Sequence, residues 1–93
     1  MREVMALVKR LHTVLGVDKK YRKDEDSMTS YDVAQHVGLT FKQEYELLAM
    51  FDERTRLDFL RRHLERVMPV VEEMEALKQK IKLNGHFRNL PSV

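Results

Sequence analysis

Cysteine is absent from this chain of 93 residues, and glycine and proline are scarce, with 3 and 2 copies. Without cysteine the chain has no disulfide framework, no thiolate nucleophile and no thiolate metal site, although a small secreted domain commonly depends on such cross-links. We therefore expect a reducing compartment, the cytoplasm. The three glycines, Gly16, Gly38 and Gly85, stand apart from one another, so no glycine-rich loop is present to cradle a phosphate.

Long apolar runs and an excess of one charge are lacking as well. No segment reaches the roughly 18 consecutive apolar residues that span a bilayer, so we expect no membrane partner. Lys and Arg number 17 against 15 Asp and Glu, and the resulting net charge of +2 favours no class of partner. Hydrophobic residues make up 43% of the chain and charged residues 34%, which is typical of a soluble helical protein. We expect a single helical domain or subdomain over residues 1–93.

The spacing of apolar residues predicts an all-α bundle of about four helices. Steps of three and four residues predict helices over about 1–15, 31–37, 41–50 and 52–84. The stretch 17–28 between the first two is dense in charges of both signs and has almost nothing to bury, so we expect a flexible linker there.

Local signals mark where these helices begin. Thr29 or Ser30 is suited to cap the second helix, and Thr40 with Gln43 three residues later has the pattern of a capping box. The apolar side of the third helix is then formed by Phe41, Tyr45, Leu48 and Leu47. Asp52 is placed to cap the fourth helix.

The fourth helix is too long for a compact chain of this size. About 32 residues at about 1.5 Å each give roughly 48 Å, whereas a compact sphere of 93 residues is roughly 32 Å across. Pro69 predicts a kink over 65–69, and Gly85 predicts the end of the helix, with 85–93 as a tail. The far half of the helix should therefore meet a partner outside this chain. One candidate is a second copy, held through the seam Leu64, Val67, Val71, Met74 and Ile81.

Residues that would carry catalysis or bind a metal are not grouped in the sequence. No two of the four histidines have the one-turn spacing that places two imidazoles on one helix face; they are His12, His36, His63 and His86. We expect no enzyme, no metal and no cofactor. Four apolar residues, however, do not all fit the seams of their helices. Ordinary core packing is the favoured role of these residues, but if exposed they would give an adaptable surface for binding polypeptides; they are Met50, Phe51, Phe59 and Met68.

Residues 33–43 also have the outline of a helix-turn-helix, with Gly38 in the turn and a polar cap behind it. Glu44 stands where the second helix of that motif needs a buried aliphatic residue. Only Lys42 and Gln43 are available to read bases, and nearby carboxylates repel phosphate. A DNA-binding regulator is therefore the alternative to a polypeptide-binding module, and nucleic acid is the less favoured partner.

A family resemblance favours the polypeptide-binding interpretation. Lys42-Gln43-Glu44, Leu47-Leu48, Asp52, Arg56-Leu57, Leu60 and Leu64, followed by a long charged helix, resemble the helical C-terminal part of the LON substrate-binding domain. That domain is the N-terminal domain of the Lon protease family. The resemblance implies a non-catalytic module that recognises unfolded or tagged proteins for an ATP-dependent protease. The β-rich lobe, the ATPase motor and the Ser-Lys protease of the family are missing from these residues, as expected for a part of a stand-alone LON-domain protein.

Overall fold

The computed structural model describes residues 1–17, 21 and 23–89, with side chains as far as residue 83. Four α-helices and one short 3₁₀ turn follow one another along the chain; they are α1 Arg2–Val14, η1 Glu25–Ser27, α2 Ser30–Ala34, α3 Phe41–Leu48 and α4 Glu53–Asn89. No strand occurs among the described residues. The predicted all-α class, with one long C-terminal helix, is confirmed.

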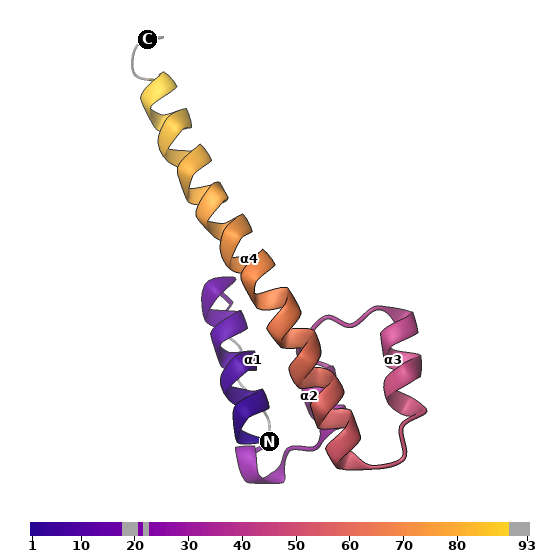
Figure 1. Ribbon diagram of the computed structural model, residues 1–93. Helices are drawn as coiled ribbons and strands as arrows, with labels where there is room; N and C mark the ends of the chain where they lie inside the picture. The colour runs from indigo at the N-terminus through magenta and orange to yellow at the C-terminus, as the bar shows by residue number, and fades with distance from the viewer. Residues whose placement is uncertain (18–20, 22, 90–93) are drawn as a thin grey trace.

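The molecule is elongated because α4 is much longer than the body that packs on it. Its extents are 61 × 27 × 19 Å and its radius of gyration is 17.2 Å, compared with about 12 Å for a compact chain of this length. Figure 1 shows α1 running alongside the first half of α4, with α2 and α3 near the same end, while the second half of α4 projects alone. The predicted overhang of the long helix is confirmed.

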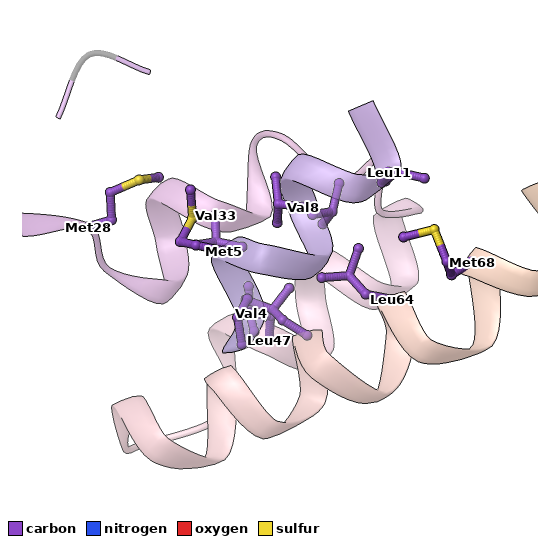
Figure 2. Close-up of a cluster of buried hydrophobic side chains, with 11 residues drawn as sticks. Val4, Met5, Val8, Leu11, Met28, Val33, Leu47, Leu64 and Met68 are labelled. Atoms are coloured by element: carbon purple, nitrogen blue, oxygen red, sulfur yellow. The ribbon is translucent and has the colours of Figure 1, made fainter. Parts of the chain in front are cut away.

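The core lies between α1, α2 and the first half of α4 (Figure 2). α1 is amphipathic and places four buried apolar side chains on one face against α4, namely Val4, Met5, Val8 and Leu11. On α4 the fully buried apolar residues follow steps of four. The core residues are Val4, Met5, Val8, Leu11, Met28, Val33, Val37, Leu47, Leu60, Leu64 and Met68.

The predicted end of the fourth helix is wrong. α4 continues through Gly85 to Asn89, so the predicted tail is helical as far as residue 89, and residues 90–93 lie outside the described part of the chain. Gly85 is tolerated because a glycine inside a helix costs only about 1 kcal/mol relative to alanine. α4 also continues on both sides of Pro69, as expected for a proline that interrupts one backbone bond without ending the helix.

The charged stretch 17–28 has more to bury than its composition suggests. Residues 18–20 and 22 lie outside the described residues, but Met28 is 8% exposed and belongs to the core. The hydroxyl of Tyr21 lies 2.7 Å from Nδ1 of His12, and Nε2 of His12 lies 2.9 Å from the backbone oxygen of His36. Tyr21, inside the predicted linker, and Met28, at its end, are therefore held against the body, and the expectation of almost nothing to bury is wrong for these two residues.

Helix starts are as the local signals predict. Thr29 and Asp32 form a reciprocal capping box at α2, and Thr40 and Gln43 form one at α3. α2 is shorter than the predicted 31–37, and the chain turns at Gly38, whose φ of 65° is one that L side chains rarely adopt. The first box fixes the start of α2, and the second fixes the end of the α2–α3 connection, where α3 begins.

Candidate functional site

The apolar side of α3 faces solvent instead of the core. Only Leu47 is buried, at 2% exposure, whereas Phe41 is 91%, Tyr45 76% and Leu48 67% exposed. These three residues are four and three positions apart, so they share one face of the helix. The prediction that they form one apolar side is confirmed, but that side does not pack on the rest of the described chain.

Phe51 extends this apolar surface beyond the end of α3. It lies in the break between α3 and α4 and is fully exposed, at 102%. We call Phe41, Tyr45, Leu48 and Phe51 the α3 surface. Beside it, a shallow hollow between α2 and α3 is lined by Tyr31, Ala34, Gln35, Glu44, Leu47 and Leu48. Aromatic and aliphatic side chains are thus exposed along α3 and in the break after it, and no other described part of the chain covers them.

The break that carries Phe51 is held by the cap of α4. The backbone N–H of Thr55 donates to Oδ1 of Asp52 over 3.1 Å, as predicted for an N-cap aspartate. Hydrogen bonds from the side chain and backbone of Thr55 lower the pKa of Asp52. On the other side of the break, the backbone N–H of Ala49 donates to the carbonyl of Tyr45 over 3.1 Å, and that of Met50 donates to the carbonyl of Leu47 over 3.1 Å.

A polar network ties the start of α4 to the start of α2. Glu53 accepts from the backbone N–H of Ser30 over 2.5 Å and from its hydroxyl over 2.8 Å. Arg56 donates to the same carboxylate over 3.1 Å, to the hydroxyl of Ser30 over 2.8 Å and to the carbonyl of Met50 over 2.8 Å. Burial raises the pKa of Glu53, but the hydrogen bonds from Ser30 and Arg56 outweigh it, so the pKa is lowered. The guanidinium also lies 4.6 Å from the ring centroid of Tyr31.

Of the four residues predicted to bind polypeptides, the structure exposes one fully. Phe51 lies on the α3 surface, whereas Met50 and Phe59 are half-buried against the core. Met68 is only 4% exposed, so it is a core residue and not one of the possible polypeptide-binding residues. The physical reason is that the buried stripe of α4 advances in steps of four from Leu60, which brings position 68 under α1.

The predicted association seam is divided between the core and the surface. Leu64 is fully buried, and Val67 and Val71 are half-buried against the core, so these three stabilise the fold itself. Met74 and Ile81 are 65% and 61% exposed. The prediction that Leu64 belongs to a self-association surface is therefore wrong, because the body of the same chain covers that residue.

Buried histidines serve the fold. His12 and His63 are each 7% exposed. Nδ1 of His63 lies 3.4 Å from the side-chain nitrogen of Gln43, and the ring also hydrogen-bonds to the backbone of Val37. Among the described side chains, no three His, Asp or Glu residues are grouped closely enough to hold a metal ion.

Stability should fall as the pH drops through the range of histidine titration. Burial lowers the pKa of His63 below its ordinary value of 6.5; the hydrogen bond to Val37 opposes this, and the positive charge of Arg66 adds to it. Below pH 6.5 the unfolded chain therefore binds a proton that the folded chain does not, so the free energy of unfolding declines by at most about 1.4 kcal/mol per pH unit for this group. Urea unfolding at about pH 7.5 and about pH 5.5 measures the effect.

His63→Gln provides the control for this pH dependence. The variant should lose less stability between the two pH values than the wild type does. Carboxylates with lowered pKa values, such as Glu53 and Asp32, lose their contribution only below about pH 4.5, in a separate window. An identical pH dependence in both proteins would contradict the assignment to His63.

The helix-turn-helix outline is present as two short capped helices, but the residues expected to read bases are poorly placed for it. Gln43 caps its own helix through Oε1, and its Nε2 approaches His63. Lys42 is exposed and is the one cation on α3, beside Glu44 and Glu46. The face of α3 is thus apolar and acidic.

Searches of protein-family models, curated proteins and solved structures each gave no match. In the part of the chain that the structure describes, no helix is both long and apolar enough to cross a membrane.

Proposed function

We propose that this chain is a non-catalytic polypeptide-binding module that resembles the substrate-recognition domain of Lon-type proteases. One observation carries the proposal: two phenylalanines, Phe41 and Phe51, are 91% and 102% exposed, one at the start of α3 and one just after its end, and α3 also exposes Tyr45 and Leu48 between them. Clustered apolar side chains on the outside of a small protein mark interaction surfaces, because exposing them to water is unfavourable. Aromatic residues are also the side chains that most often dominate binding energy at interfaces.

The charges around the α3 surface indicate what kind of polypeptide suits it. Glu44 and Glu46 are exposed on α3, and Lys42 is its one basic residue. An apolar surface with an acidic border favours unfolded segments in which apolar residues alternate with Lys or Arg. The same border disfavours nucleic acid, whose phosphates it repels.

The backbone that carries Phe51 is held in place, which suits a module that binds a polypeptide and catalyses no reaction. The Ser30–Glu53–Arg56 network and the Asp52 cap hold the break that carries Phe51, so the aromatic side chain is presented by an ordered backbone. A presented aromatic loses less conformational entropy on binding than one on a free loop. In the Lon family, such a module delivers substrates to an attached or separate ATP-dependent protease.

Removing the two phenylalanines should abolish most of the binding. The probe is a permanently unfolded protein, reduced and carboxymethylated α-lactalbumin with a fluorescent label, titrated with the chain and followed by anisotropy. We expect Phe41→Ser combined with Phe51→Ser to weaken binding by at least tenfold, because aromatic hot spots are each worth about 2 kcal/mol. Both side chains lie outside the core, so the fold should survive, as circular dichroism will show.

Leu77→Ser is the matched control, since Leu77 is 56% exposed but lies on the projecting half of α4. It should bind the unfolded probe like the wild type. Equal losses in both variants, or no binding by the wild type, would overturn the proposal. Binding instead to a DNA duplex, falling steeply with salt and lost in Lys42→Glu, would support the regulator interpretation.

A further inference from the structure

The projecting half of α4 carries a second apolar surface, separate from the α3 surface. Val70, Met74, Leu77 and Ile81 are 54%, 65%, 56% and 61% exposed. Their steps of four, three and four place them on one face over about three turns of helix. We call these four residues the distal stripe.

The distal stripe is not a continuation of the core. At about 100° per residue, the face that holds Leu60 and Leu64 continues beyond Val71 through Lys78 and Lys82, which are charged. The stripe is turned away from that face by roughly a quarter of the helix circumference. It follows instead the side of α4 on which His63 lies, seven residues before Val70. An apolar stripe away from the core indicates a surface for another helix.

Charges are segregated along this part of α4. Glu72, Glu73 and Glu75 form an acidic block, and Lys78, Lys80 and Lys82 form a basic block immediately after it. Glu72 is bridged to Arg10 of α1 over 2.6 Å, while Glu73 and the three lysines are exposed. The centre of the distal stripe lies at the boundary between the two blocks. Two copies of this helix segment that run in opposite directions therefore bring the acidic block of each copy beside the basic block of the other.

We propose that the distal stripe binds the distal stripe of a second copy of this chain in antiparallel orientation. Met74 of each copy packs against Leu77 of the other, and Val70 packs against Ile81 of the other. This register brings Glu73 beside Lys80 of the second copy, twice by symmetry. Apolar layers supply the association, and the charge blocks set its direction.

A parallel pair is disfavoured by the charges along α4. It would place the acidic blocks of the two copies side by side and the basic blocks side by side. Only Glu73 of one copy and Lys78 of the other would still form a diagonal pair of opposite charge. Like-charge contacts cost up to about 1 kcal/mol each at 4 Å in water.

Sedimentation equilibrium over a range of protein concentrations tests the association. The stripe spans 12 residues, fewer than the three to four heptads of a stable coiled coil, so we expect a weak, concentration-dependent dimer. Leu77→Asp should weaken it by at least tenfold without affecting the fold, since Leu77 is exposed. Phe51→Ser is the control and should dimerise like the wild type. A wild-type monomer at all concentrations, as expected if another protein covers the stripe, would overturn the proposal.

Cross-linking tests the direction, helped by the absence of native cysteine. In the antiparallel pair, Val70→Cys mixed with Ile81→Cys should form a disulfide between the two variants. Val70→Cys alone should not, because its two copies are separated by 11 residues, about 16 Å along the axis, beyond the roughly 7 Å limit between Cα atoms. A disulfide in Val70→Cys alone, and none in the mixture, would show a parallel pair and overturn the proposal. Leu77→Asp should still bind the unfolded probe, which separates this proposal from the proposed function.

Discussion

Leu64→Ala is expected to lower the free energy of unfolding by about 2–5 kcal/mol, the range for a fully buried leucine. Leu64 is 0% exposed and lies between α4 and the apolar face of α1 (Figure 2). A protein of this size has a total stability of the order of 5–15 kcal/mol, and half of α4 adds little to the core. The loss is therefore a large part of the total, and urea unfolding followed by circular dichroism measures it.

Met74→Ala is the matched control for Leu64→Ala. Met74 occupies the same helix ten residues further on but is 65% exposed. Its substitution should change the free energy of unfolding by no more than about 0.5 kcal/mol. Comparable losses in the two variants would contradict the arrangement in which only the first half of α4 is packed.

Glu53→Ala is the second substitution with a large expected effect, about 1–3 kcal/mol of unfolding free energy. It removes the acceptor of the backbone N–H and hydroxyl of Ser30, a residue that is 0% exposed, and it leaves Arg56 without its carboxylate. Water reaches the Glu53 side chain, which is 42% exposed, so the effect should not exceed this range. Urea unfolding at pH 7, where the carboxylate is ionised, measures it.

Glu65→Ala is the control, because Glu65 also pairs with an arginine, Arg61, over 3.0 Å, but at the surface. An exposed pair contributes about 0–1 kcal/mol, so this variant should lose less than Glu53→Ala. A double-mutant cycle of Glu53→Gln with Arg56→Met isolates the coupling, which should lie in the range of about 0.5–3 kcal/mol for residues in one network. Additive losses would show that the network does not act as a unit.

Features encoded locally could be predicted from the sequence. The capping box of Thr40 and Gln43 and the cap at Asp52 depend on residues three positions apart, so their spacing alone indicates them. The overhang of α4 followed from periodicity and size, although the helix was predicted to end at residue 84 and continues to Asn89. The shared face of Phe41, Tyr45 and Leu48 was also visible as a pattern.

Features that depend on distant residues could not be predicted. Periodicity shows which residues share a face of α3, but whether that face meets the core depends on the path of the whole chain. Ser30 and Glu53 are 23 residues apart, and no local signal pairs them. The choice of Met68 over Val67 as a core residue reflects the drift between a straight helix with 3.6 residues per turn and the predicted 3.5-residue seam.

The long helix is continuous in geometry but uneven in stability. Its first half gains from packing against α1, whereas the stretch from Glu73 to Leu83 has exposed apolar residues and depends mainly on its own backbone hydrogen bonds. Isolated helices of fewer than about 12–15 residues are marginal in water. Whatever covers the distal stripe must therefore also order the helix beneath it. Binding there is in part a folding reaction, with a negative change in heat capacity and an affinity lower than the contact area alone suggests.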